Sequence, residues 1–135
     1  MDLLPCILAA VFGLLLAVQL AFRWYARRLQ GKPVPALGGN RDRLVREHAR
    51  LLLYFFSPHC GQCRAMTAMV QRLSEKHPNV VLLDVSREQE VMRRFGIVAT
   101  PTTVLVEGGQ VRRVLLGVRP ERVLVGGVGD AACRW

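Results

Sequence analysis

Cysteine is scarce in this sequence: the chain of 135 residues has four, Cys6, Cys60, Cys63 and Cys133. Two of them form a C-x-x-C pair and two stand alone, which is not the pattern of a disulfide-rich secreted scaffold. Cys6 lies in an apolar segment, where we expect a small buried hydrophobe. Cys133 lies two residues from the C-terminus and is expected to be an incidental exposed thiol.

Acidic residues are also few, ten against nineteen Lys and Arg, so the formal net charge is +9. A basic chain suggests nucleic acid, but the arginines are scattered and no helix-turn-helix, RNA-recognition or zinc-finger pattern is present. We therefore expect no nucleic-acid partner. A basic domain tethered beside anionic lipid is a simpler explanation, and some of the charge solvates the surface.

Charged residues are absent from residues 3–22, where Gln19 is the one clearly polar side chain. At about 1.5 Å per residue, about 20 residues cross the roughly 30 Å hydrocarbon core of a bilayer. A cleavable signal peptide is the alternative. The run has no basic region before it and no small-x-small cleavage site before Arg23, so the sequence favours a transmembrane helix.

Aromatic and basic residues follow this run, as they do at a membrane–water boundary: Arg23, Trp24, Tyr25, Arg27, Arg28 and Lys32. We expect a single-pass protein of a bacterial inner membrane. The positive-inside rule places its C-terminal domain in the cytoplasm. A periplasmic domain is the alternative. Residues 23–40 are predicted to be a basic juxtamembrane segment and linker, because residues 30–40 hold two prolines and three glycines.

Residues 41–126 have the pattern of one α/β domain. A short helix to about Arg50 precedes a buried strand at 51–56, and apolar residues at helical spacing follow from Cys60 to Lys76. The remaining expected elements are a strand at 80–85, a helix to Arg94 with a capping box of Ser86 and Gln89, strands at 102–106 and 111–116, and a helix at 121–125 after Pro120. This order predicts a mixed central sheet flanked by helices. Residues 127–135 are predicted to be a disordered tail.

The C-x-x-C pair lies between a buried strand and a helix. The unpaired N–H groups and the dipole at a helix N-terminus stabilise an anion, so Cys60 is expected to form a thiolate near neutral pH. Cys63 could then resolve a mixed disulfide formed by Cys60. Half of a zinc site is the alternative, but His48, His59, His77 and Cys133 form no second ligand pair, and we expect no metal.

A second motif, FGIVATPTT at residues 95–103, precedes the predicted hairpin. With the C-x-x-C after the first core strand, it resembles the thioredoxin family over roughly residues 41–126. The resemblance implies a thioredoxin-like fold preceded here by one transmembrane helix. It also implies thiol–disulfide oxidoreductase activity through a redox-active disulfide of Cys60 and Cys63, with no further cofactor. Pro101 matches the family's cis-proline, and Thr100 and Pro101 would bind substrate.

Several residues near the pair differ from the usual family pattern. Gln62 stands where thioredoxins have proline and His59 where they have tryptophan; together with Gly61, these residues are expected to tune the redox potential. A protonated His59 would stabilise the Cys60 thiolate, whereas a solvated one would be idle. Tyr54 occupies the position at which the family keeps a buried acid that assists proton transfer at the second cysteine.

The sequence as a whole predicts a membrane-anchored thiol–disulfide oxidoreductase that reduces or exchanges disulfides in membrane-proximal partner proteins and serves cell redox homeostasis. Reduction is favoured in the cytoplasm, which keeps thiols reduced. In the periplasm, disulfide exchange, oxidation or cytochrome maturation would be favoured instead. The alternatives are a non-catalytic binding or assembly module with the same fold, and a metal-delivery protein that uses Cys60, Cys63 and His59.

Overall fold

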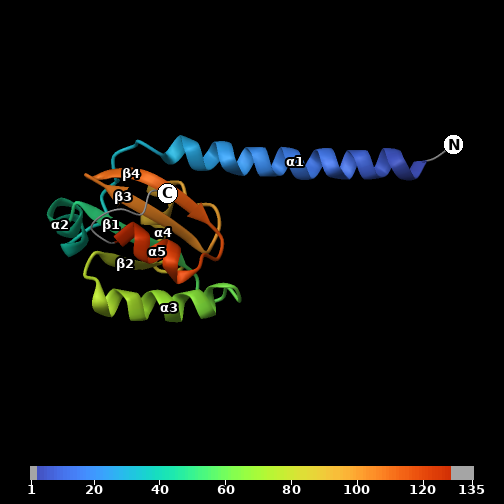
Figure 1. Ribbon diagram of the computed structural model, residues 1–135. Coiled ribbons are helices and arrows are strands. Elements are labelled where there is room, and N and C mark those ends of the chain that lie inside the picture. The colour runs from blue at the N-terminus through green and yellow to red at the C-terminus, as the bar shows by residue number, and fades with distance from the viewer. Residues whose placement is uncertain (1–2, 129–135) are drawn as a thin grey trace.

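A mixed four-stranded sheet with helices on both faces forms the domain, and a long N-terminal helix projects from it (Figure 1). The computed structural model describes residues 3–128. Its elements in chain order are α1 (Leu3–Leu29), α2 (Asn40–Glu47), β1 (Arg50–Phe56), α3 (Cys63–Lys76), β2 (Val80–Asp84), α4 (Gln89–Phe95), β3 (Thr102–Glu107), β4 (Gln110–Leu116) and α5 (Glu121–Val128).

The strand order is β2-β1-β3-β4, with β1 parallel to β2 and antiparallel to β3, and β3 antiparallel to β4. Strand β1 is therefore central, and its residues 51–55 are all buried. The continuous apolar run predicted a strand covered on both faces, and this prediction is confirmed. The predicted mixed sheet flanked by helices is confirmed as well.

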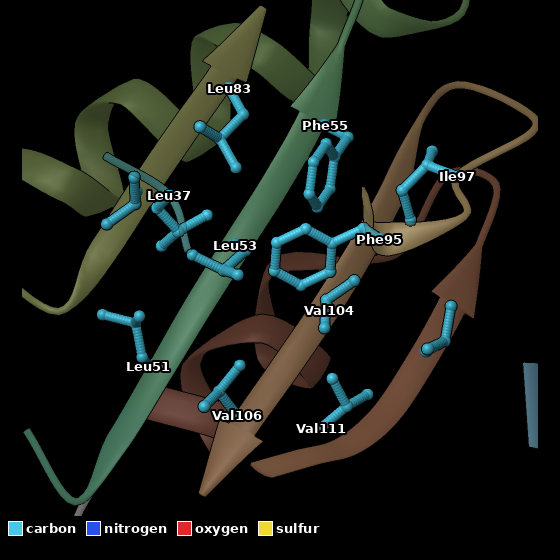
Figure 2. Packing of buried hydrophobic residues seen from close by; sticks show 12 residues of the cluster. Leu37, Leu51, Leu53, Phe55, Leu83, Phe95, Ile97, Val104, Val106 and Val111 are labelled. Atoms are coloured by element: carbon cyan, nitrogen blue, oxygen red, sulfur yellow. The ribbon is translucent and has the colours of Figure 1, made fainter. Parts of the chain in front are cut away.

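Alternate residues of β1 enter two separate hydrophobic clusters, because successive side chains in a strand point to opposite faces. Leu53 and Phe55 join the cluster covered by α4, where the Phe55 and Phe95 rings meet edge to face at 5.3 Å (Figure 2). Leu52 and Tyr54 join the cluster covered by α3 and α5. The two clusters hold β1, and with it the loop that follows Phe56, in one position.

Several helix boundaries differ from the sequence predictions. Helix α2 ends at Glu47 rather than near Arg50, because Arg50 already pairs with Glu107 of β3 as the first residue of β1. Helix α3 begins at Cys63 rather than at Cys60, so the first cysteine lies in the preceding turn. The predicted capping box is wrong: Glu88 is the N-cap of α4, and the Ser86 hydroxyl instead donates to Asp84 Oδ1 at 2.6 Å.

Helix α5 continues to Val128, because Gly127 and Val128 are buried. The domain therefore extends past the predicted boundary at residue 126, and the first two residues of the predicted tail are helical. The rest of that tail, with Cys133, lies outside the described residues.

Helix α1 is apolar and long enough to cross a membrane. It continues past Phe22 to Leu29, since no Gly or Pro occurs between Phe22 and Gly31, and Ala26 and Leu29 pack against the cluster around Phe55. The segment after it is held against β4. Gly31 N donates to Val111 O at 2.7 Å, and Val111 N donates to Lys32 O at 2.9 Å. This part of the predicted linker is thus an ordered connection between helix and domain.

Leu124→Ala in α5 tests the packing of the cluster around Tyr54. The Leu124 side chain is fully buried, so its truncation leaves a cavity and should lower the free energy of unfolding by about 2–5 kcal/mol. Val125→Ala is the matched control, because Val125 is exposed and should change stability by less than about 0.5 kcal/mol. Urea denaturation of the detergent-solubilised chain measures both. Equal losses in the two variants would contradict the packing described here.

Candidate functional site

Four loops meet at one end of the sheet, which we call the cysteine end: residues 57–62, 85–88, 96–101 and 117–120. Because β1 and β3 are antiparallel, the carboxyl end of β1 adjoins the start of β3, and Phe55 pairs with Thr102. This register brings together two loops that are far apart in the sequence. As a result, Cys60 Sγ lies 3.8 Å from the Thr100 carbonyl oxygen, to which the thiol donates.

The cysteine loop is a compact turn held by backbone hydrogen bonds. Cys60 N donates to Ser57 O at 3.1 Å, and Cys63 N donates to Cys60 O at 3.2 Å. The second bond places Cys60 directly before the first turn of α3. The first backbone N–H groups of a helix have no partner within the helix, so they are available to a neighbouring thiolate.

The facing loop is shaped around Pro101. The Thr100–Pro101 peptide bond is cis. Pro101 O accepts a hydrogen bond from Gly117 N at 2.9 Å, and the Thr102 hydroxyl donates to Ala99 O at 2.7 Å. These bonds fix the loop from both sides and aim the Thr100 carbonyl at Cys60.

The two cysteines are free thiols in unequal surroundings: Cys60 is half-buried, whereas Cys63 is 1% exposed. A hydrogen bond with the Cys63 side chain lowers the pKa of Cys60, and hydrogen bonds with the Thr100 side chain and the backbone of Cys63 and Gln62 act in the same direction. Burial raises the pKa of Cys63, and its hydrogen bond with Cys60 adds to the effect. The arrangement therefore favours a thiolate at Cys60 and a thiol at Cys63.

The remaining predicted site residues line this turn. His59, Gly61 and Gln62 are all exposed. The His59 backbone N–H donates to Ser57 Oγ at 3.3 Å, and Gln62 is the N-cap residue of α3. The structure thus gathers Cys60, Cys63 and Thr100 by direct contacts, while the exposed residues between and beside the cysteines border the solvent.

Tyr54 lies beneath the pair, fully buried, and its hydroxyl is 3.1 Å from Thr67 Oγ1. Burial raises the pKa of Tyr54 to about 12, so the phenol stays protonated at neutral pH. Thr67 is a residue that the sequence reasoning missed. The available signal was its position four residues after Cys63, which puts both side chains on the same face of α3.

The candidate metal ligands that lie within the described residues, His48, His59 and His77, do not converge. His48 and His77 follow the carboxyl ends of α2 and α3, at the opposite end of the sheet from Cys60. Within residues 3–128, no group of three His, Cys, Asp or Glu side chains is placed to hold a metal ion.

Comparisons with known proteins agree with this geometry. The Thioredoxin family model matches residues 38–129. A thioredoxin from Alicyclobacillus acidocaldarius subsp. acidocaldarius is 29% identical over 94 residues, which cover 67% of this chain and 90% of that protein. Mitochondrial thioredoxin 3 of Saccharomyces cerevisiae has a similar solved structure, with a TM-score of 0.54 and 27% identity over 64% of this chain and 82% of that one. A mutant thioredoxin of Halobacterium salinarum superposes with a TM-score of 0.60 at 22% identity, covering 75% of this chain and 95% of that one.

The fold and its C-x-x-C turn place this protein in the class of thiol–disulfide oxidoreductases. Within that class, this chain belongs to the thioredoxin family. The family match begins at residue 38, after α1, so the N-terminal helix is an addition to the shared domain.

The unequal thiols predict a pH-dependent alkylation pattern. In a variant that lacks Cys6 and Cys133, the iodoacetamide reaction at Cys60 should rise with pH at a midpoint below that of an unfolded peptide thiol, because its pKa is lowered. Cys63→Ala should move this midpoint upward, since it removes the main hydrogen bond that stabilises the thiolate. Peptide mass spectrometry after timed quenching gives both profiles. An unchanged midpoint in Cys63→Ala would show that Cys63 does not stabilise the thiolate.

Proposed function

We propose that this protein is a membrane-anchored thiol–disulfide oxidoreductase in which Cys60 is the nucleophile and Cys63 resolves the mixed disulfide. The observation that carries the proposal is the opposite shift of the two thiol pKa values beside the Thr100 carbonyl. The half-buried cysteine is the one favoured as a thiolate, and the thiolate is the form that attacks a disulfide.

Reduction of a substrate then proceeds in two exchanges. The Cys60 thiolate attacks one sulfur of the substrate disulfide, that S–S bond breaks, and the first substrate sulfur leaves as a thiolate that takes up a proton from water. Cys63 next loses its proton and attacks Cys60 Sγ, which releases the second substrate sulfur as a thiol. The substrate gains two electrons and two protons, and the protein is left with a Cys60–Cys63 disulfide. No cofactor is needed, and the reverse sequence transfers a disulfide to a substrate dithiol.

Proton transfer at the second step differs from a mechanism based on a buried carboxylate. Tyr54 remains a neutral phenol at neutral pH, so it cannot accept the Cys63 proton as a carboxylate would. We assign that proton to the second substrate sulfur, which leaves Cys60 Sγ as a thiolate when Cys63 attacks and is the base nearest to the reacting atoms.

Helix α1 supplies the membrane anchor. The apolar side chains of residues 3–22 are exposed, as expected for a surface that contacts lipid. At the boundary, the Arg28 guanidinium lies 3.5 Å from the centre of the Trp24 ring, which combines the two residue types enriched at membrane interfaces. The positive charges after the span favour a cytoplasmic domain, and in that compartment the favoured direction is reduction.

Cys63→Ala tests the assignment of the two cysteines. Without the resolving thiol, the covalent complex between Cys60 and its substrate should accumulate, because the second exchange cannot occur. Non-reducing electrophoresis of acid-quenched cells should show covalent complexes, and dithiothreitol should cleave them. Cys60→Ala should show none, and Cys6→Ser should behave as the parent protein. Complexes that form through Cys63 in Cys60→Ala would reverse the assignment, and their absence from every variant would favour a non-catalytic binding module.

The anchor and its orientation predict a protection pattern. The chain should remain in the membrane fraction after alkaline carbonate washing. This wash releases proteins held at the membrane surface by charge, but it does not extract a helix that spans the bilayer. In intact spheroplasts of a bacterial host, a membrane-impermeant maleimide should not label Cys60, and lysis should expose it. Labelling before lysis would place the domain outside the cytoplasm, and release by carbonate would contradict the anchor.

A further inference from the structure

Helix α1 leaves the domain on the side of the cysteine end (Figure 1). Its last turns are packed in place: a Cβ atom on Gly96 would lie 3.5 Å from Tyr25 Oη and 3.6 Å from Leu29 Cδ2. Gly96 opens the loop that ends at Pro101. The helix therefore touches the same loop that presents the Thr100 carbonyl to Cys60.

An apolar groove marks this junction. Its lining comes from α1 and from the tip of the loop: Val18, Ala21, Phe22, Tyr25 and Val98. The groove places Val98 beside the last turns of the segment that we assign to the membrane, residues 3–22. If Phe22 marks the boundary of the hydrocarbon core, Val98 lies at that boundary too.

Exposed apolar side chains on the domain are concentrated at the same end. Outside α1, the large exposed hydrophobic residues of the described chain are Val98, Val118 and Val125, and the first two belong to the cysteine end. Val98 is 62% exposed and Val118 is 55% exposed, in loops joined by the hydrogen bond from Gly117 N to Pro101 O. Exposure of these apolar side chains to water is unfavourable, and contact with a membrane interface would remove them from water.

Basic side chains accompany these valines. Arg64 follows the cysteine pair, Arg119 follows Val118, and both are exposed. Positive charge at a bilayer surface is attracted by anionic headgroups. Apolar residues with basic neighbours, next to a helix that continues into the membrane, are the composition of a surface that rests on lipid.

We propose that α1 holds the cysteine end against the bilayer surface, so that its substrates are cysteine pairs at the membrane boundary of integral membrane proteins. This inference rests on the proposed anchor and thiol chemistry. The docked helix fixes the direction of the cysteine end, because the packing of Tyr25 and Leu29 and the backbone bonds of Gly31 join helix and domain. A disulfide held far from the membrane would meet the opposite end of the domain first and reach Cys60 less often.

Site-directed spin labelling in nanodiscs with anionic lipid measures the position directly. The full chain is used with its four cysteines replaced. A label at Val98→Cys should then be readily accessible to dissolved oxygen and poorly accessible to a water-soluble nickel complex, as is typical of the bilayer interface. A label at Glu75→Cys, exposed at the opposite end of α3, should have the accessibility of an aqueous site. Aqueous accessibility at both positions would overturn the proposal. It would leave the anchor and the chemistry untouched, because the anchor is tested by flotation of the same samples.

Substrate choice provides the second readout. Two single-span model proteins are incorporated with the full chain in proteoliposomes, one with a disulfide next to its span and one with the same disulfide beyond a polar spacer of about 30 residues. Reduction of the boundary disulfide should be at least about tenfold faster, because its effective concentration at Cys60 is higher. Equal rates would contradict the orientation, whereas failure to reduce either substrate would contradict the proposed function instead.

An insertion variant serves as the matched control for the role of the docked helix. A flexible Gly-Ser segment between Phe22 and Arg23 keeps the span and keeps Tyr25 and Leu29 on the domain, but it uncouples the two. The preference for the boundary disulfide should then fall towards unity while the rate with the distant disulfide is maintained or increased. A preference that survives the insertion would show that the docked helix does not set it.

Discussion

Burial of β1 on both faces is the constraint on which the rest of the structure depends. Its residues 51–55 alternate between two hydrophobic clusters, one under α4 and the end of α1, the other under α3 and α5. A strand held in this way has no freedom to slide, since a shift of one residue would exchange the two sets of side chains between clusters of different shape. The antiparallel register with β3 therefore fixes Cys60 opposite Thr100.

The chemistry of the pair follows from a difference in environment between two identical side chains. Cys60 lies before the first turn of α3, where hydrogen bonds converge on its sulfur, and Cys63 lies inside that turn, out of contact with water. Cys60 is favoured as a thiolate and Cys63 as a neutral thiol. The hydrogen bond from the Cys63 thiol to the Cys60 sulfur stabilises both of these states. Tyr54, directly beneath the pair, stays a neutral phenol at neutral pH.

The junction between α1 and the domain combines the two halves of the molecule into one body. The connection could have been a loose tether, since its prolines and glycines exclude regular structure. Instead, its backbone pairs with β4, and the last turns of α1 cover part of the domain's core. With α1 as the proposed membrane span, a junction held in this way converts the direction of the helix into the direction of the cysteine end. A flexible tether would supply proximity to the membrane without orientation.

Local patterns in the chain were sufficient for the class of fold, for the presence of a long apolar N-terminal helix, and for the choice of Cys60 and Cys63 as candidates. The run at 51–56, the spacing of Cys60 and Cys63, and the motif around Pro101 are properties of neighbouring residues, and they carried the prediction of the mixed sheet and the candidate site. Element boundaries were less accurate. Ser86 and Gln89 have the spacing of a capping box, but the Ser86 hydroxyl bonds to Asp84 instead, and two equivalent local partners cannot be ranked from their order in the chain.

Other features depended on contacts between distant segments. The 3.8 Å approach of Cys60 to Thr100, the Tyr54–Thr67 hydrogen bond and the docking of Tyr25 beside Gly96 each join residues brought together by the packing of sheet and helices. Sequence periodicity reports which face of an element is buried, but not which partner covers it. The sequence by itself therefore determined which residues are present for thiol chemistry and that the N-terminal helix is apolar and long enough to cross a membrane. Only the tertiary structure decided that Cys60 and Cys63 have opposite pKa shifts and that the cysteine end lies on the side from which α1 projects, because both depend on how separate elements pack.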